Sequence, residues 1–483
     1  MSARPTQFDR NLVVIGAGSA GLVCAMVAAQ LGASVTLVER HEMGGDCLNT
    51  GCVPSKALIH AAHLMHSARQ AAALGLIPAP AAPDTRAAFA HVRASIRAVA
   101  PHDSVERFRN MGVDVRLGSA RILSRWAVAI GDEVLTTRAI VIASGAAPRV
   151  PQIPGIDDTG YLTSETLWQL DEAPRRLLVL GGGPIGCELS QAFARLGSQV
   201  TLVQRPLRLL EREEEEASAL VQQRLQADGV RVLTDHRAVD ARIVNGERVM
   251  RLHHDSEDCD VPFDRVLVAT GRRPRTDGFG LEALKIEIAK DGTIATSPFL
   301  ETSVPGIYAC GDVAGPWQFT HAAGHQGWHA AVNALFHPLH RIRPDRATMP
   351  AVTYTSPEVA RVGETERQLR EQGRACDVTI HDLAELDRAI VDDARDGFVK
   401  ILTAPGSDRI LGATIVAPRA GEMLPEVIVA MERKLGLKSL FSTIHAYPTY
   451  SEALRDAGGQ WRIRHAPTWA RRVLSRFHRW RRG

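Results

Sequence analysis

Two cysteines, Cys47 and Cys52, stand five positions apart in a segment bracketed by glycines. One distorted helical turn between them would let the two sulfurs meet. A thiol pair at that distance can form and break a disulfide, and its thiolates can attack another disulfide or bind a soft metal ion. The chain has seven cysteines, and an odd, scattered set of this kind excludes a secreted disulfide framework. The other five are Cys24, Cys187, Cys259, Cys310 and Cys376.

A redox pair needs a source of electrons, and a dinucleotide fingerprint precedes this one by about thirty residues. An apolar strand at residues 11–15 runs into a turn with Gly16, Gly18 and Gly21, an alanine-rich helix follows, and the next strand ends in Glu39. The glycines let the backbone approach a pyrophosphate at a helix N-terminus, and the acid can accept a hydrogen bond from a ribose hydroxyl. Strands, glycines and acid at this spacing together indicate a dinucleotide site.

The same pattern returns about 165 residues later, with the glycines Gly181, Gly183 and Gly186. Its second strand ends in Gln204-Arg205 instead of an acid. A carboxylate there would repel a 2′-phosphate, whereas Arg205 and Arg208 can bind one through paired hydrogen bonds. The repeat therefore predicts a second dinucleotide site that takes NADPH in preference to NADH, and a chain that feeds electrons into the cysteine pair.

The 483 residues are too many for one core, and the patterns divide them. An apolar strand ending in Gly311-Asp312 indicates that the first nucleotide fold resumes after the second. We expect an α/β protein with two Rossmann-like domains, the second inserted in the first, and a C-terminal α+β domain with a half-exposed sheet. The segments are 1–150 and 279–346 for the first nucleotide-binding domain, 151–278 for the second, 347–460 for the C-terminal domain, and 461–483 for a tail.

Composition and charge narrow the class of protein. Hydrophobic residues make up 45% of the chain and charged residues 23%, which is ordinary for a globular enzyme. The net charge is +3, but residues 461–483 hold eight arginines and no acid, so the rest is net acidic. Nucleic-acid binding by this acidic body is not expected. With no signal peptide and no run of about 18 apolar residues, a cytoplasmic address is expected.

Together these motifs resemble the class I pyridine nucleotide–disulfide oxidoreductases, over residues 10–460. That family includes dihydrolipoamide dehydrogenase, glutathione reductase and mercuric reductase. The resemblance implies FAD on the first nucleotide fold, a nicotinamide cofactor on the second, and a homodimer formed through the last domain. It also implies that Cys52 is the sulfur next to the flavin, Cys47 is the interchange thiol, and Lys56 lies beside the flavin and pairs with Glu188.

The resemblance also implies two sets of cofactor-binding residues. For FAD these are Gly16, Gly18, Gly21, Glu39, Arg40, Gly45, Ala120, Ser144, Gly145, Gly311, Asp312 and Ala322. For NADPH they are Gly181, Gly183, Gly186, Arg205, Arg208 and Gly271. No residue is expected to hold a resident metal ion.

The C-terminal motif departs from the family pattern. In dihydrolipoamide dehydrogenase and glutathione reductase a histidine precedes Pro-Thr, serves the partner subunit as acid–base and is oriented by a glutamate. Here Tyr447 takes that position, while Glu452 keeps its place. Tyrosine has a pKa of about 10 and histidine one of about 6.5, so Tyr447 is a poor base at neutral pH. His445, two residues earlier, is a candidate substitute.

Mercuric reductase is similar in having tyrosine at this position, and residues 188–203 also resemble it. That enzyme passes metal through a vicinal C-terminal cysteine pair, whereas no cysteine follows Cys376 here, and no N-terminal metal-binding domain is expected. We therefore expect an FAD-dependent NADPH oxidoreductase that passes electrons through Cys47 and Cys52 to a small disulfide or a soft metal ion. One alternative is a dihydrolipoamide dehydrogenase using NAD. The other is a membrane-docked flavoprotein scaffold without catalysis.

The tail has a pattern of its own. Trp469, Val473, Phe477 and Trp480 fall on one face of a helix, with most of the arginines elsewhere. A basic amphipathic helix of this kind can lie in an anionic membrane surface, which predicts a peripheral membrane contact through residues 461–483. The alternative is a helix packed on the dimer with its arginines exposed.

Overall fold

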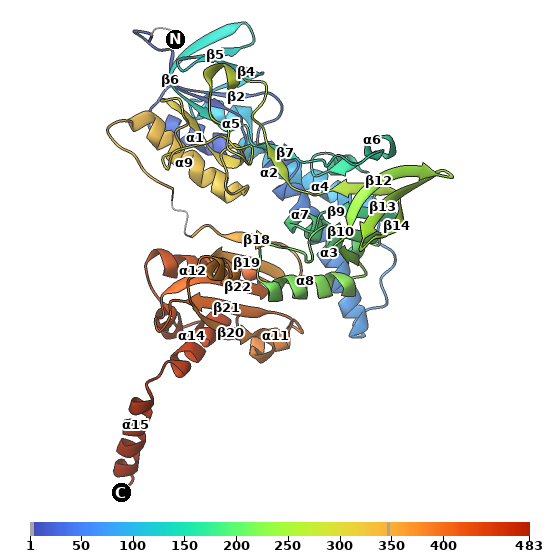
Figure 1. The fold of residues 1–483 in the computed structure, drawn as a ribbon, viewed down its shortest axis with the longest axis vertical. Helices are drawn as coiled ribbons and strands as arrows, with labels where there is room; N and C mark the ends of the chain where they lie inside the picture. Colours follow the sequence, from blue (N-terminus) through green and yellow to red (C-terminus); the bar gives the residue numbers. More distant parts are fainter. Residues whose placement is uncertain (1–3, 345–347) are drawn as a thin grey trace. The chain divides into compact units, whose positions relative to one another are not determined.

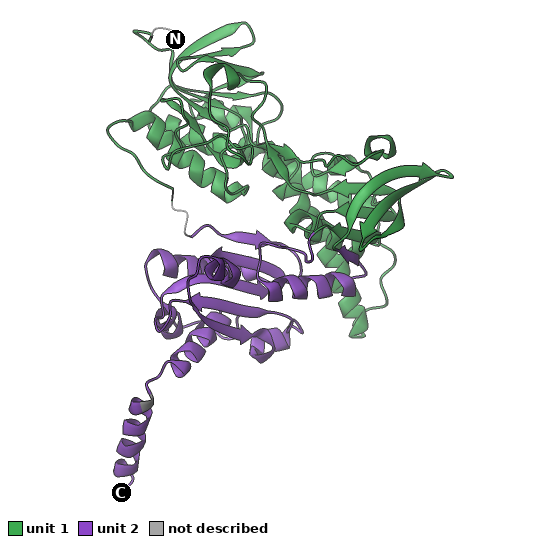
Figure 2. Cartoon of the chain, in the orientation of Figure 1, with its two compact units in different colours: residues 1–205, 235–344 green, residues 206–234, 345–483 purple. Residues whose placement is uncertain are grey.

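A computed structural model describes residues 4–344 and 348–483 of the chain (Figure 1). The chain forms two compact units, residues 1–205 with 235–344 and residues 206–234 with 345–483, here called unit 1 and unit 2 (Figure 2). The predicted fold class is confirmed: unit 1 contains two Rossmann-like sheets, and unit 2 contains an antiparallel sheet with helices.

The first Rossmann-like sheet of unit 1 is built around β1, which pairs in parallel with β2 and β6. Strand β3 continues the sheet beyond β2, and β17 pairs in parallel with β6. Because β17 comes after the whole second nucleotide fold in the chain, the second fold is inserted in the first. The bounds are β1 Arg10–Ile15, β2 Val35–Glu39, β3 Asp114–Leu117, β6 Glu133–Ile142 and β17 Ile307–Ala309.

Alternation along these strands fills both faces of the sheet. Leu12 and Val14 of β1 belong to one core cluster, whereas Val13 and Ile15 belong to another. The first cluster is completed by α1 (Ser19–Gln30) and α9 (Thr320–Phe336), which pack on each other. The second includes residues from β4 (Ala120–Ser124) and β5 (Ala127–Ile130). Because both faces of the sheet are buried, the sequences of these strands are continuous apolar runs.

The second Rossmann-like sheet has the parallel order β10-β9-β15-β8. A three-stranded antiparallel sheet, β12-β13-β14, comes between β10 and β15 in the chain, and β7 pairs with β16 where the chain crosses between the two nucleotide folds. The bounds are β7 Ala146–Pro148, β8 Leu162–Thr163, β9 Arg176–Leu180, α7 Pro184–Arg195, β10 Gln199–Gln204, β12 Arg237–Val244, β13 Glu247–His254, β14 Glu257–Phe263, β15 Arg265–Val268 and β16 Arg272–Pro274.

The helices that carry the cysteine segment also belong to unit 1. Helix α3 packs against α4 and α7, and α2 packs against α3. The long α3 is therefore anchored on α7 of the second nucleotide fold, while its N-terminus directly follows α2. The bounds are α2 Gly45–Asn49, α3 Cys52–Ala73, α4 Thr85–Val99 and α5 Val105–Asn110.

Unit 2 has the antiparallel sheet β18-β19-β22-β21-β20. The expected half-exposed sheet is wrong for its central strands, because every residue of β21 and β22 is buried. The start of α8 covers part of this sheet. There Glu214 and Glu216 accept hydrogen bonds from Lys400 of β21, which is only 1% exposed. The bounds are α8 Glu215–Ala227, β11 Arg231–Thr234, β18 Ala351–Thr353, β19 Glu358–Gly363, α10 Glu366–Glu371, β20 Asp377–Asp382, α11 Asp387–Val391, β21 Phe398–Thr403, β22 Ile410–Ala417, α12 Ala420–Glu432 and α13 Leu437–Ser442.

Two helices end the chain, α14 (Glu452–Arg464) and α15 (Thr468–Arg481). Trp461, which sequence analysis assigned to the tail, is 3% exposed and belongs to the core of unit 2. The boundary expected at residue 460 therefore falls inside α14, and the separate element is α15. Within the described residues, no helix has both the length and the apolar character needed to span a membrane.

Candidate redox site

The two cysteines of the motif lie at a break between two helices. Cys47 is on α2, and Cys52 is the first residue of α3. A Cβ at Gly51 would lie 2.8 Å from the Asp46 carbonyl oxygen, so a glycine permits the tight turn that separates the helices. The two sulfurs are within hydrogen-bonding reach of each other, as the spacing predicts, and both are free thiols here. The Cys52 sulfur is also 3.1 Å from the Thr320 hydroxyl.

The two thiols have opposite acidities. The hydrogen bond from Cys47 lowers the pKa of Cys52 to about 6, and Thr320 and the Lys56 charge act in the same direction against the effect of burial. The same hydrogen bond, together with burial, raises the pKa of Cys47 far above its usual range. The positive end of the α3 dipole further favours a thiolate at Cys52. At neutral pH the reduced pair is therefore a Cys52 thiolate that accepts a hydrogen bond from the Cys47 thiol.

Lys56 and Glu188 form an ion pair near Cys52. The Lys56 ammonium, one turn further along α3, donates to the Glu188 carboxylate of α7 at 2.7 Å. Glu188 is 5% exposed, and a carboxylate is this deeply buried only when a cation or donors compensate it. This is the pairing that the family resemblance implies. Glu188, on a helix of the second nucleotide fold, thus holds the positive charge of Lys56 near the Cys52 thiolate.

The first glycine turn leaves room for a pyrophosphate. A Cβ on Gly21 would collide with the Gly16 carbonyl oxygen, so Gly21 serves helix–strand packing. A Cβ on Gly18 would only touch the Gly45 Cα at 3.8 Å, so packing does not require a glycine there, but a phosphate approaching the backbone would. The Glu39 carboxylate accepts from Ala17 N at 2.7 Å at the same turn. These residues fit FAD at the N-terminus of α1.

Further FAD candidates gather around Arg272. Its guanidinium forms ion pairs with Asp46 and, at 3.3 Å, with Asp312, which lies just after β17. Burial raises the pKa of Asp312, and Arg272 opposes that rise. Ser144 donates to the Arg275 carbonyl at 2.7 Å, next to Gly145, which has a positive φ of 71°.

The remaining FAD candidates have packing roles in the structure. Gly45 packs on the glycine turn, and Gly311 donates its N–H to Gln326 at 2.7 Å. Ala120 and Ala322 are buried apolar residues of β4 and α9, whereas Arg40 is exposed after β2. Among the described contacts, no hydrogen bond or ion pair joins Arg40 to the glycine turn.

The second glycine turn repeats the first, except that the neutral Gln204 takes the place of the acidic Glu39. A Cβ on Gly183 would meet nothing within 4 Å, so that position is also open to a phosphate, whereas Gly186 packs on Gly181 as Gly21 packs on Gly16. Gln204 accepts from Gly182 N at 2.7 Å, as Glu39 does from Ala17. The amide thus keeps the hydrogen bond of the acid but carries no negative charge.

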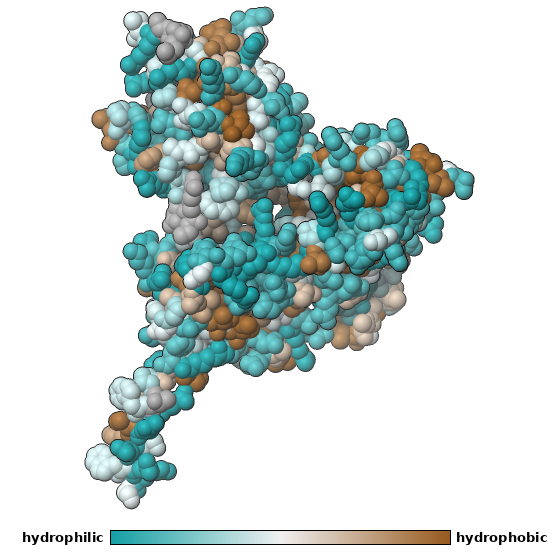
Figure 3. Space-filling model, viewed as in Figure 1, coloured by the Kyte–Doolittle hydropathy of each residue, from teal (hydrophilic) through white to brown (hydrophobic). Residues whose placement is uncertain are grey.

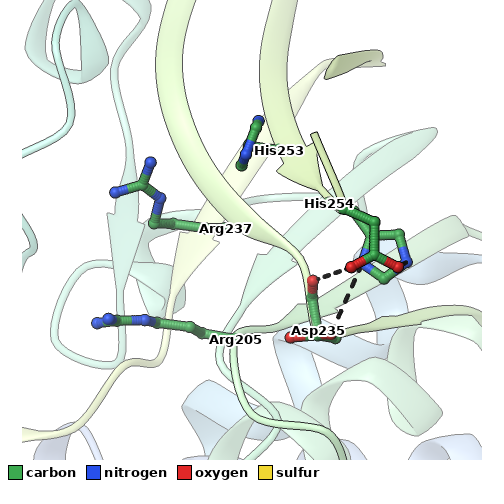
Figure 4. A pocket seen from close by; sticks show the side chains of 6 residues that line it. Arg205, Asp235, Arg237, His253 and His254 are labelled. Atoms are coloured by element: carbon green, nitrogen blue, oxygen red, sulfur yellow. Dashed lines mark hydrogen bonds and ion pairs between the residues drawn. The ribbon is translucent and has the colours of Figure 1, made fainter. Parts of the chain in front are cut away.

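A pocket lies beside this turn, lined by Arg205, Asp235, Arg237, His253, His254 and Asp255. Figure 4 shows the side chains of Arg205 and Arg237 extending to the same side, with His254 beside Asp235 on the other. Arg208 does not line this pocket. It belongs to unit 2, where it donates to the Glu211 carbonyl at 3.0 Å. Gly271, with a φ of 118°, follows β15.

The acidic side of the pocket holds a possible cation-binding group that the sequence did not suggest. Asp235, His254 and Asp255 each offer a ligand atom, and these atoms lie within 4.8 Å of one another. The Nδ1 atom of His254 already bonds the Asp235 carbonyl at 2.8 Å, which raises the pKa of the imidazole. The contacts of His254 with Asp235 and with the Asp255 carboxylate at 3.2 Å account for the group without a metal ion.

The C-terminal candidates Tyr447, His445 and Glu452 lie in unit 2, whereas the cysteine pair lies in unit 1. The Tyr447 hydroxyl donates to Asp387 at 3.0 Å, and this bond raises the pKa of the phenol. The Nε2 atom of His445 lies 3.0 Å from Glu426, and its Nδ1 atom lies 3.0 Å from the Thr443 carbonyl. Both ring nitrogens of His445 are therefore engaged.

Glu452, the first residue of α14, is 3% exposed and accepts from Thr449 N at 3.1 Å. It stabilises the turn before α14, and among the described contacts its hydrogen bond goes to Thr449 and not to Tyr447. In this chain the acid thus fixes the backbone that presents the tyrosine, whereas the family pattern has it orient a histidine.

Three residues of these sites escaped sequence reasoning: Thr320 beside Cys52, Arg237 in the pocket, and Asp387 on Tyr447. Each lies outside a glycine or cysteine motif. Arg272, by contrast, directly follows Gly271 in the run Gly271-Arg272-Arg273-Pro274, so a basic residue in a cofactor motif could have identified it.

Comparison with known proteins places the chain. Mercuric reductase from Staphylococcus aureus is 32% identical over 452 residues, which cover 93% of this chain and 82% of the relative. Dihydrolipoyl dehydrogenase from Thermus scotoductus is 34% identical over 461 residues, which cover 92% of this chain and 96% of the relative. A solved Cu(II) complex of the HOCl-induced flavoprotein disulfide reductase RclA from Escherichia coli superposes with a TM-score of 0.82 at 28% identity, covering 92% of this chain and 98% of that chain.

Two family matches cover most of the sequence. Residues 349–458 match the dimerisation domain of the pyridine nucleotide-disulphide oxidoreductases, which supports a homodimer. Residues 10–327 match the main family domain, whose members depend on FAD and a pyridine nucleotide. The cysteine pair, the two glycine turns and these matches agree, and the chain belongs to the pyridine nucleotide-disulphide oxidoreductase family.

Proposed function

We propose that this chain is an NADPH-dependent flavoprotein reductase whose Cys47–Cys52 pair delivers electrons to a soft metal ion. The observation that carries the choice of acceptor is that Tyr447 occupies the position where the family pattern has its acid–base histidine. Its hydrogen bond to Asp387 raises the pKa of the phenol further, so no group of near-neutral pKa stands there. Bound FAD supplies electron-pair transfer between the nicotinamide and the cysteine pair.

Reduction of a disulfide substrate needs a proton at the right moment. The Cys47 thiol would release its proton to solvent and its sulfur would attack the substrate, so that one substrate thiolate leaves. The Cys52 thiolate would then displace the second substrate thiolate and close the Cys47–Cys52 disulfide. The leaving thiolate has a pKa of about 8.5, below that of a phenol, so proton transfer from Tyr447 to it is unfavourable. A disulfide is therefore the slower substrate for this site at neutral pH.

A soft divalent metal ion makes a smaller demand on proton transfer. The Cys52 thiolate binds first, and binding of the Cys47 sulfur releases one proton to solvent as the second metal–sulfur bond forms. One NADPH then supplies the two electrons that reduce one mercuric ion to the metal, or two cupric ions to cuprous ions, with release of NADP⁺ and one proton. The freed Cys47 thiolate takes a proton back from solvent, so each turnover releases one proton in all. No side chain must protonate a leaving thiolate in this sequence.

The relatives support this choice. One curated relative is named mercuric reductase, and one structural neighbour is a Cu(II) complex of a disulfide reductase. The dihydrolipoyl dehydrogenase relative, 34% identical, supports the second candidate, oxidation of dihydrolipoamide with NAD. Tyr447 in place of histidine and Gln204 in place of an acid both favour the first candidate over the second.

The preference for NADPH follows from the second glycine turn and its pocket. Gln204 keeps the hydrogen bond to Gly182 without a charge that would repel a phosphate. Arg205 and Arg237 extend to one side of the pocket, and a 2′-phosphate can accept charge-assisted hydrogen bonds from both.

Steady-state assays of the FAD-loaded protein at pH 7, without oxygen, test the proposal. NADPH oxidation is followed with mercuric ion, cupric ion, glutathione disulfide or lipoamide, and NADH is compared with NADPH. We expect a metal ion to turn over at least about tenfold faster than either disulfide. The double variant Cys47→Ser/Cys52→Ser should lose this activity, and the matched control Cys376→Ser should keep it. Faster turnover of lipoamide or glutathione disulfide, or metal reduction by the double variant, would refute the proposal.

A further inference from the structure

Helix α15 presents a large exposed apolar surface. Its large apolar side chains are between 45% and 76% exposed, namely Trp469, Val473, Leu474, Phe477 and Trp480. Figure 3 shows brown, white and teal atoms side by side along this helix. One described polar contact ties it to the preceding helix, from Arg471 to the Ile463 carbonyl at 2.8 Å. Isolated helices of this length are marginal in water, so α15 needs a surface that covers its apolar side.

The apolar residues form one stripe. At 3.6 residues per turn, Trp469, Val473, Phe477 and Trp480, spaced by four, four and three positions, fall on one side, with Leu474 at its edge. An indole stands at each end of the stripe. Indole rings prefer the boundary between water and an apolar phase, because the ring is apolar and its N–H needs a polar partner.

The rest of the helix surface is basic. Six exposed arginines lie outside the stripe and flank it, five within α15 and one directly after it: Arg471, Arg472, Arg476, Arg479, Arg481 and Arg482. No acidic residue follows Asp456 in the chain. Guanidinium groups on both flanks of an apolar stripe can pair with phosphates while their aliphatic stems stay near the apolar phase.

These features distinguish between possible occupants. A nucleic acid would explain the arginines but not the Trp–Val–Phe–Trp stripe. A groove on a second copy would cover the stripe and leave most of the arginines repelling one another in solvent. An anionic lipid surface accounts for both sets at once, because headgroup phosphates face the arginines while the boundary of the acyl chains receives the stripe. The 14 residues of α15 measure about 21 Å, shorter than the roughly 30 Å hydrocarbon layer, so the helix would lie in the plane of the surface.

We propose that α15 docks this reductase on a membrane surface rich in anionic lipid, with Trp469, Phe477 and Trp480 inserted at the headgroup boundary. This goes beyond the proposed function, and its test uses binding, not turnover. It also accounts for the placement of positive charge in the last helix of a chain whose remainder is net acidic.

Flotation of the full-length, FAD-loaded protein with vesicles tests it. Vesicles of phosphatidylcholine alone are compared with vesicles that contain one quarter phosphatidylglycerol. We expect at least about tenfold more bound protein on the anionic vesicles, and a blue shift of tryptophan fluorescence on binding. The variant Trp469→Ala/Phe477→Ala/Trp480→Ala keeps every charge and should lose both effects. The variant Arg471→Gln/Arg472→Gln/Arg479→Gln should lose the preference for anionic lipid.

The charge control removes three exposed arginines elsewhere, Arg97→Gln/Arg265→Gln/Arg395→Gln, and should bind like the wild type. Flotation of the triple-alanine variant equal to that of the wild type would overturn the proposal. So would a change of that variant from dimer to monomer by light scattering, which would assign α15 to a second copy. Unchanged thermal unfolding of each variant shows that the rest of the protein stays folded.

Discussion

The Thr320 hydroxyl lies 3.1 Å from the Cys52 sulfur, although the two residues are 268 positions apart. Thr320 is the first residue of α9, and Cys52 is the first residue of α3. Two helix N-termini therefore meet at one sulfur, and both favour a negative charge there. Together with the Cys47 thiol, this arrangement makes Cys52 the more acidic member of the pair.

Replacing Thr320 should make Cys52 less acidic. Thr320→Val keeps the shape but removes the donor, and one hydrogen bond to a charged group is worth roughly one pKa unit. In the wild type, the rate of iodoacetamide alkylation of the reduced protein should reach half its plateau near pH 6, because the thiolate is the reactive form and the pKa is about 6. In Thr320→Val that midpoint should move up by about one pH unit.

Cys47→Ala provides the companion measurement. It removes the donor with the largest effect on Cys52, so the alkylation midpoint should move further up than in Thr320→Val, toward about 8.5. Cys52→Ala should abolish the low-pH phase, which assigns it. If the midpoint stays near pH 6 in both Thr320→Val and Cys47→Ala, the pair does not control the acidity of Cys52.

The Lys56–Glu188 pair predicts two opposite shifts. The Lys56 charge lowers the pKa of Cys52, and the Glu188 charge raises it. Lys56→Met should therefore move the alkylation midpoint up, and Glu188→Gln should move it down, each by at most about one unit. The double variant should lie between the single variants. Shifts of the same sign would show that both residues act through the fold and not through their charges.

The local part of this site was predictable from sequence. The strand, glycine turn and helix of β1 and α1 are contiguous, and the five-residue spacing of the cysteines limits how far apart their sulfurs can be. Lys56 follows Cys52 by one helical turn, which places it near that sulfur. The nucleotide folds and the redox pair could therefore be predicted, because their motifs consist of residues close together in the sequence.

Residues brought in by tertiary packing were not predictable. Thr320 reaches Cys52 only because α9 packs on α1, and Arg237 enters the pocket only because β12 begins beside β10. Neither position has a composition or spacing that marks it. The half-exposed sheet was expected because a lysine in a strand usually faces solvent, whereas Lys400 of β21 is buried.

The pocket arginines should decide between the two nicotinamide cofactors. Arg205→Ala and Arg237→Ala each remove a charge-assisted hydrogen bond to a 2′-phosphate, worth roughly 1.5–3 kcal/mol, so kcat/KM for NADPH should fall about 10- to 100-fold. The value for NADH, which has no 2′-phosphate, should change less than about threefold. The control Arg265→Ala removes an exposed arginine outside the pocket and should affect neither cofactor. Equal losses for NADPH and NADH would place the arginines outside the phosphate site.

Tyr447→His tests why this member of the family should prefer metal ions. The histidine titrates near pH 6.5 and can protonate a leaving thiolate, so turnover of glutathione disulfide or lipoamide at pH 7 should rise by about tenfold or more, whereas reduction of a metal ion should change little. The gain should follow a bell-shaped pH profile that the wild type lacks.

Two further variants separate chemistry from structure at this position. Tyr447→Phe removes the bond to Asp387 without adding a base, so it should not raise disulfide turnover. Tyr447→His/Asp387→Asn keeps the imidazole but removes the nearby carboxylate, which should lower the pKa of the new histidine. The alkaline limb of the profile, where the imidazolium loses its proton, should therefore move to lower pH. If Tyr447→Phe accelerates disulfide turnover as much as Tyr447→His, relief of the Asp387 contact explains the gain, and the argument from proton transfer fails.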